Sequence, residues 1–131
     1  MLQYKVIARK NPMTKNTKFY PTLLSPVPIT LTQIAGEIEK ISSLSRGDIK
    51  NVLDNLQHVV LGHLTNGRSI RLGDLGSFRP SLRSSGSLSK EDVTAANIRS
   101  VCVVYTPSTE MRRTLKPSAL RFEKQAETPS P

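Results

Sequence analysis

Hydrophobic residues recur with a helical period between residues 30 and 66. In the first part of this region they fall three or four positions apart and form one stripe: Leu31, Ile34, Ala35, Ile38 and Ile41. A longer stripe comes after Ser45 and stops at Asn66-Gly67, a typical end of a helix: Ile49, Val52, Leu53, Leu56, Val59, Val60 and Leu64. Thr30 or Thr32 suits the cap of the first helix, and Ser45 that of the second. The pattern predicts a helical hairpin.

The hydrophobic period changes to two after Arg68. Ile70 and Leu72 alternate with polar neighbours, and Gly73-Asp74-Leu75-Gly76 is typical of a turn. A second alternating segment then places Phe78, Pro80 and Leu82 on one parity and Arg79, Ser81 and Arg83 on the other. Residues 98–105 form a β-rich run. These segments predict a small antiparallel sheet, with a loop at residues 84–87 and a helical turn at residues 91–96 before the last strand.

The two ends of the chain carry further signals. Residues 2–8 alternate as a strand, residues 11–16 are rich in turn formers, and residues 18–24 suit a returning strand at a sheet edge because Pro21 lies in it. Thr106-Pro107 predicts the start of a last short helix, with Pro at its first position and with Met111 and Leu115 facing inward. Beyond Pro117 we expect a tail that is disordered at its end.

The resulting fold class is α+β. Three parts are expected: an N-terminal β-hairpin extension at residues 1–28, a main domain at residues 29–117 and a C-terminal tail at residues 118–131. Of the 131 residues 37% are hydrophobic and 5% aromatic, so any core is small and aliphatic. A domain of this size has little apolar surface to spare, and oligomerisation would stabilise it.

Charge adds a clue about the partner. The chain has 19 Lys and Arg against 10 Asp and Glu, a net charge of +9. Residues 1–28 contain five bases and no acid, and residues 67–83 contain four arginines against Asp74, whereas residues 29–66 are close to neutral and residues 84–97 carry one base and two acids. Such uneven placement favours a binding face for a polyanion, although a solvated charged surface is the simpler alternative.

Catalytic and metal chemistry find little support in the sequence. His58 and His63 lie about 140° apart around a helix, so they cannot share a metal unaided. Cys102, the single cysteine, has no partner for a disulfide and fits a structural role in a reducing cytosol. Residues 62–69 imitate a phosphate-binding loop, but a helix precedes them and a strand follows, the reverse of what that loop requires. We expect no enzyme, no cofactor and no metal site.

Membrane and export signals are not expected either. No apolar run approaches the roughly 20 residues that cross a bilayer. The first ten residues, MLQYKVIARK, do not resemble a signal peptide.

The order of these elements resembles that of a known protein family. A helical hairpin, the segment IRLGDLGSF at residues 70–78, a strand, a further β run and a Pro-started helix together resemble the HU/IHF family of bacterial histone-like DNA-binding proteins. The similarity covers about residues 29–117. Within the family it is greatest to extended HU-like proteins of Bacteroides-type bacteria, which carry an extra N-terminal segment. The most specific piece is Gly73-x-x-Gly76-x-Phe78, which resembles the family's GFGTF motif.

The resemblance implies an intertwined homodimer whose β-arms reach around duplex DNA and bend it through the minor groove. The family's arm is rich in Arg and Lys and ends in a proline that wedges between base pairs. Residues 84–97, at the corresponding place, have no Pro, so the wedge is not carried over. Arg79 and Arg83 match the start of the arm, where contacts with the DNA backbone are implied.

We therefore expect a homodimeric, largely sequence-nonspecific protein of the bacterial nucleoid, in the cytoplasm, that binds double-stranded DNA and no membrane or small-molecule substrate. The candidate DNA-binding residues are Arg68, Arg71, Arg79, Arg83, Lys90 and Arg99. A structural or protein-interaction module that keeps the fold but binds DNA weakly or not at all is the main alternative, favoured by the acidic arm. RNA binding and membrane-surface binding rank lower, because the β surface lacks paired aromatics and the helices have mixed outer faces.

Overall fold

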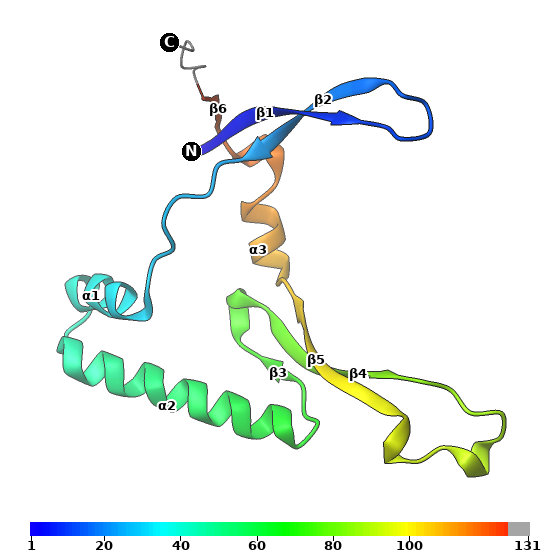
Figure 1. Cartoon of the computed structure of the whole chain (residues 1–131). Coiled ribbons are helices and arrows are strands. Elements are labelled where there is room, and N and C mark those ends of the chain that lie inside the picture. The colour runs from blue at the N-terminus through cyan, green and yellow to red at the C-terminus, as the bar shows by residue number, and fades with distance from the viewer. Residues whose placement is uncertain (126–131) are drawn as a thin grey trace. The chain divides into compact units, whose positions relative to one another are not determined.

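The computed structural model describes residues 1–125, which fold as two compact units (Figure 1). One unit comprises Ile29–Arg112. The other comprises Met1–Pro28 together with the segment that begins at Arg113. Each unit contains a three-stranded sheet, in the order β3-β4-β5 in the first and β2-β1-β6 in the second. The mixed α+β class expected from the sequence is confirmed.

The helical hairpin is formed by α1 (Leu31–Ile41) and α2 (Arg46–Thr65), as predicted. Thr30 caps α1 in a capping box: its hydroxyl accepts a hydrogen bond from the Gln33 amide at 3.3 Å, and the Gln33 side chain accepts one from the Thr30 amide at 2.8 Å. Ser45 caps α2 by accepting a hydrogen bond from the Asp48 amide at 3.2 Å. These caps satisfy amides that would otherwise lack partners at the helix starts.

The end of α2 explains where the chain turns toward the sheet. Gly67 has a φ of 76°, and its amide donates to the Leu64 carbonyl, while the Arg68 amide donates to the His63 carbonyl. This pair of hydrogen bonds is the Schellman arrangement, which needs a residue in the left-handed region and therefore favours glycine. The predicted helix stop is confirmed.

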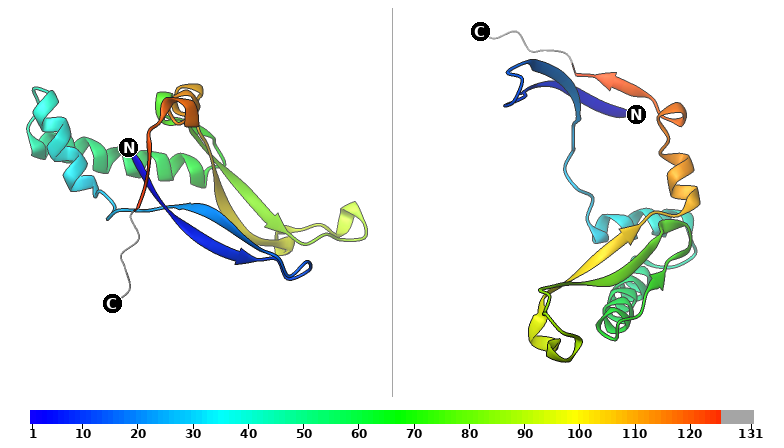
Figure 2. Two further views of the ribbon diagram at one scale, coloured as in Figure 1. Left: turned by 90° about the horizontal axis from the view of Figure 1, so that it is seen from above. Right: turned by 90° about the vertical axis from the view of Figure 1, so that its right-hand side faces the viewer.

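The sheet of the Ile29–Arg112 unit is antiparallel. Its strands are β3 (Ile70–Arg71), β4 (Ser77–Ser84) and β5 (Ile98–Thr106), and β4 and β5 form a long two-stranded ribbon (Figure 2). The predicted turn between β3 and β4 is a 3₁₀ turn at Gly73–Leu75. Two further 3₁₀ turns, Lys90–Asp92 and Ala95–Asn97, lie between β4 and β5, where the sequence predicts one helical turn.

The glycines of the β3–β4 turn are required by the backbone. Gly73 and Gly76 have φ values of 59° and 118°. A Cβ atom on Gly76 would lie 2.5 Å from the Thr106 carbonyl oxygen and 2.8 Å from the Tyr105 ring. Two side chains hold the turn from outside: the Tyr105 hydroxyl donates to the Leu75 carbonyl, and the Ser108 hydroxyl donates to the Asp74 carbonyl, both at 2.6 Å. The Gly-x-x-Gly-x-Phe motif therefore fixes how β4 enters the sheet.

The second sheet contains β1 (Leu2–Lys10), β2 (Thr17–Leu23) and β6 (Phe122–Lys124). The predicted N-terminal hairpin is confirmed, and β2, which contains Pro21, is an edge strand as expected. The described residues after Pro117 form a 3₁₀ turn at Pro117–Ala119 and then β6, a strand that was not expected from the sequence and that pairs parallel with β1. The disorder predicted for the end of the tail falls on residues 126–131, outside the described residues.

The last helix, α3 (Thr109–Thr114), begins two residues later than predicted. Ser108 stands before it, and its hydroxyl accepts a hydrogen bond from the Met111 amide at 3.0 Å. Pro107 thus precedes the cap and does not occupy the first helical position. Leu115 lies beyond the helix and is 55% exposed, so the expected inward position is also wrong.

The apolar stripes of the helices are largely uncovered. Among the described residues, Ala35 and Ile49 are the hydrophobic residues that the chain buries fully. Val52, Leu56 and Val59, all on the predicted stripe of α2, are 59%, 40% and 53% exposed. The single chain therefore leaves much of its apolar surface in contact with water.

A substitution at Gly76 tests the strained turn. We expect Gly76→Ala to destabilise the protein by about 3 kcal/mol, because the added Cβ meets backbone and because alanine is strained at this φ. Gly62→Ala is the matched control. Gly62 lies inside α2 with nothing within 4 Å of its added Cβ, so this change should stabilise by about 0.5–1 kcal/mol. Urea unfolding monitored by circular dichroism measures both, and equal stability of the two variants would contradict this account.

Candidate nucleic-acid interface

The β4–β5 register separates two faces of the sheet. Arg79 pairs with Val104 and Arg83 with Ser100, while Arg71 of β3 pairs with Ser77. Because side chains alternate along a strand and paired residues share a face, all three arginines project from the same side. We call this side, with Arg71, Arg79 and Arg83, the arginine face. Each of the three is exposed.

The opposite face of the same sheet is apolar. Phe78 pairs with Tyr105, and their rings lie 5.2 Å apart between centroids. Further along the ribbon the pairs are Pro80 with Val103 and Leu82 with Val101. Leu82 and Val101 are 58% and 65% exposed, so this face, like the helical stripes, is not covered within the chain.

The charge of the sheet is of one sign. Its three strands contain four arginines and no Asp or Glu. Within residues 1–125, the arginines of the arginine face form no ion pair, in contrast to Arg46, which lies 3.4 Å from a carboxylate oxygen of Glu39. A guanidinium group carries five N–H donors in a planar fork that matches two phosphate oxygens. The arginine face can therefore bind phosphate groups without first breaking a salt bridge to a described residue.

The other predicted site residues are not on this face. Arg68 lies between α2 and β3, outside the strand that contains Arg71, because the Arg68 amide takes part in the Schellman turn. Lys90 is exposed in a 3₁₀ turn between β4 and β5. Arg99 belongs to β5 but has no Cα partner in β4, since the register shifts between Arg83 and Ser84. The structure thus groups three of the six candidates.

The segment between β4 and β5 is closed by Asn97. Its side-chain amide donates to the Ser85 carbonyl at 3.1 Å and to the Ser87 hydroxyl at 2.9 Å, and the Ser85 amide donates to the Asn97 carbonyl at 2.9 Å. Nearby, Ser89 donates to the Asp92 carboxylate at 2.8 Å. This end of the ribbon is a small hydrogen-bonded cap with exposed acids, whose charge opposes that of the arginine face.

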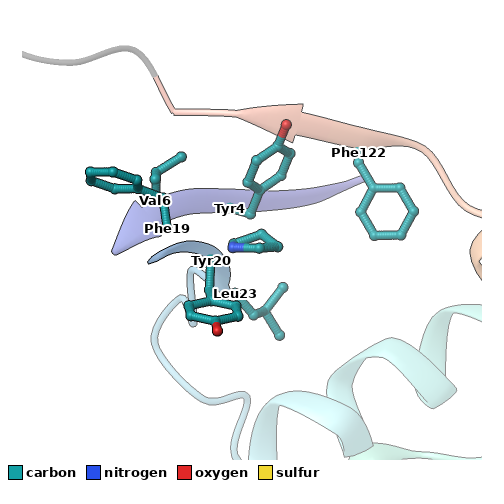
Figure 3. Close-up of a pocket in the computed structure, with 7 residues that line it drawn as sticks. Tyr4, Val6, Phe19, Tyr20, Leu23 and Phe122 are labelled. Carbon is teal, nitrogen blue, oxygen red and sulfur yellow. The ribbon is translucent and has the colours of Figure 1, made fainter. Parts of the chain in front are cut away.

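An apolar pocket on the second sheet was not anticipated from the sequence. It is lined by side chains of β1, β2 and β6 (Figure 3): Tyr4, Val6, Phe19, Tyr20, Pro21, Leu23 and Phe122. The alternation of residues 2–8 predicted only a strand, and in this strand Tyr4 and Val6 share the side that lines the pocket. The contribution of Phe122 could not be foreseen, because β6 was not expected.

Residues 1–125 show neither a metal site nor a membrane-spanning helix. In this part of the chain, no three His, Cys, Asp or Glu side chains come together as metal ligands would. The helices described there are too short or too polar to span a bilayer.

Residues 1–124 match the model of the HU-HIG family, described as an HU domain fused to a wHTH, Ig or glycine-rich motif, and the chain belongs to this family. The expected HU-like character is thereby confirmed. The more exact assignment to extended HU-like proteins stays a prediction.

Among solved structures, the chain is similar to the crystal structure of a candidate bacterial DNA-binding protein from Bacteroides vulgatus. The TM-score is 0.70 at 18% sequence identity, and the alignment covers 98% of this chain and 50% of the other. The chain therefore spans about half the length of that protein, and the likeness at this identity concerns the fold. No curated protein matches the chain.

Proposed function

We propose that this chain binds double-stranded DNA through the arginine face, with little sequence preference, as an architectural protein of the bacterial nucleoid. The observation that carries the proposal is the placement of Arg71, Arg79 and Arg83, exposed and without an ion pair to a described residue, on one side of a sheet whose strands contain no Asp or Glu. Membership of an HU-type family and the fold of a candidate DNA-binding protein support it. No catalytic step, cofactor or small-molecule substrate is part of this function.

The mechanism rests on the DNA backbone. Arg79 and Arg83 are four residues apart on β4, which separates them by about 13 Å in an extended strand. This distance lets them contact different phosphates. Each contact neutralises a phosphate charge and releases a condensed counterion, which gives affinity without reading the bases. Lys90, Arg99 and Arg68, which lie off the arginine face, are proposed to add peripheral charge.

A homodimer is the second element of the proposal. One chain leaves exposed the α2 stripe and the apolar face of the sheet, including Val52, Val59, Leu82 and Val101. Burying apolar surface stabilises by about 25 cal/mol per Å², so covering these side chains is a strong driving force. A second copy presents the same uncovered surfaces, and a two-fold interface can cover both sets at once. The arginine faces would then stay outward.

Strong kinking of DNA is not part of the proposal. A side chain wedged between base pairs is usually apolar or proline and projects from a basic arm. Here residues 84–97 contain no proline and have one base against two acids. Hydrogen bonds from the Asn97 side chain close this segment into a compact cap. We propose that DNA lies along the arginine face and that the acidic residues of this cap stay away from the phosphates.

A protein-interaction role without DNA binding is the second candidate. The acidic cap at residues 84–97 favours it, since acids repel phosphates, and the family is one of HU domains fused to other modules. In the first function the arginine face contacts DNA, and in the second it does not. Substitution of these arginines therefore distinguishes the two functions.

Removing charge from the arginine face is the direct test. We expect Arg79→Gln/Arg83→Gln to make the slope of log Kobs against log salt shallower by about 2 on a duplex of 30–40 base pairs, because about 0.9 is lost for each phosphate contact. The control is Lys40→Gln/Lys50→Gln, which removes the same charge from α1 and α2. Fluorescence anisotropy over a salt series measures both. An unchanged slope for the arginine variant would contradict the arginine face as the DNA contact, and a wild-type chain that binds no duplex would favour the protein-interaction role.

The dimer has its own measurement. Sedimentation equilibrium should give a mass of twice the 14.5 kDa of one chain. The thermal midpoint should also rise with protein concentration, because unfolding then includes dissociation. A 14.5-kDa species whose midpoint does not depend on concentration would contradict the homodimer.

A further inference from the structure

The N-terminal sheet also has two unlike faces. Register pairs Tyr4 with Leu23 and Ala8 with Phe19, on the side that forms the apolar pocket in Figure 3. The alternate pairs, among them Lys5 with Thr22 and Arg9 with Lys18, occupy the other side. No register shift interrupts the ladder from Tyr4 to Lys10, so the parity holds along the hairpin. Lys5, Arg9 and Lys18 therefore share one side, whereas Lys10 has the parity of Ala8 and lies next to the turn.

Arg9 and Lys18 are direct cross-strand partners. Side chains opposite each other on antiparallel strands lie about 5 Å apart at Cβ, and like charges in such a pair destabilise the sheet. Residues 1–28 contain no acid that could offset the repulsion. Glu123 of β6 is on the same sheet, but it pairs with Gln3 at the opposite end of β1. Binding an anion between Arg9 and Lys18 would relieve this repulsion.

The turn beside this pair completes a polar recess. The recess is lined by three basic residues, three turn residues and one tyrosine: Arg9, Lys10, Lys18, Asn11, Thr14, Asn16 and Tyr20. The turn is ordered by hydrogen bonds, since the Asn11 amide donates to the Asn16 carbonyl at 2.9 Å and the Met13 amide donates to the Asn11 side-chain oxygen at 2.9 Å. Three basic residues and several polar residues thus line one recess, and hydrogen bonds within the turn hold this segment in place.

We propose that Arg9, Lys10 and Lys18, which we call the hairpin cluster, form a second binding site for the phosphate backbone of duplex DNA. This inference rests on the proposed function, because it assumes that the chain engages DNA. The cluster lies in the Met1–Pro28 part of the second compact unit, separate from the arginine face of the Ile29–Arg112 unit. The chain then contacts phosphates through two basic surfaces, and both contribute to the number of counterions released.

A charge-removal pair tests the hairpin cluster in the full-length chain. We expect Arg9→Gln/Lys18→Gln to make the salt slope shallower by about 2 on the same 30–40-base-pair duplex. Lys40→Gln/Lys50→Gln, which removes the same charge from the helices, should leave the slope unchanged. An unchanged slope for the hairpin variant, or an equal change in both variants, would overturn the proposal.

A charge-preserving exchange separates charge from structure. Arg9→Lys/Lys18→Arg keeps both cations on the ladder, so we expect the wild-type slope, with far-UV circular dichroism confirming that all variants are folded. A shallower salt slope for this exchange variant would show that the positive charges do not account for the binding, and it would overturn the inference.

The outcomes also distinguish this inference from the proposed function. If the wild-type chain binds DNA and only Arg79→Gln/Arg83→Gln makes the salt slope shallower, the proposal of the hairpin cluster is wrong and that of the arginine face stands. If only Arg9→Gln/Lys18→Gln makes the slope shallower, the proposal of the arginine face is wrong and that of the hairpin cluster stands. A wild-type chain that binds no duplex rejects both.

Discussion

The structure depends on one constraint, which is that the chain cannot cover its own apolar surface. Ala35 and Ile49 are buried among the described residues, yet Val52, Val59 and Leu82 remain more than half exposed. A protein in water stabilises such a fold by burying these side chains against another molecule. The proposed homodimer would meet this need, and it would leave the arginine face of the β3-β4-β5 sheet for DNA, because the apolar face would be covered by the second copy.

The separation of the two faces follows from strand register. Moving β4 by one residue would place Arg79 and Arg83 on the apolar side and Phe78 on the basic side. The turn before β4 prevents this slip: Gly73 and Gly76 adopt backbone conformations that other residues rarely adopt, and Gly76 lies against Thr106. The glycine motif that resembles a family signature therefore fixes the register of β4, and this register places the arginines on one face.

Local signals in the sequence were sufficient for the helical hairpin, the cap of its second helix and the alternation of β4, because each depends on residues close together in the chain. The arginine face could be partly anticipated, since Arg79 and Arg83 share a parity, whereas the place of Arg68 depended on the turn after α2. The strand β6 could not be foreseen. It has three residues and exists through parallel pairing with β1, more than 100 positions away.

The central claim is that DNA contacts the arginine face. An NMR titration of the ¹⁵N-labelled full-length chain with a 30–40-base-pair duplex tests it most directly. The account predicts that the largest shifts fall on the side-chain Nε–H groups of Arg71, Arg79 and Arg83 and on the β4 amides around them. The α2 amides around Val52 and Val59, on the surface assigned to the second copy, should change little. Shifts concentrated on α2, with the arginine signals unmoved, would contradict the account.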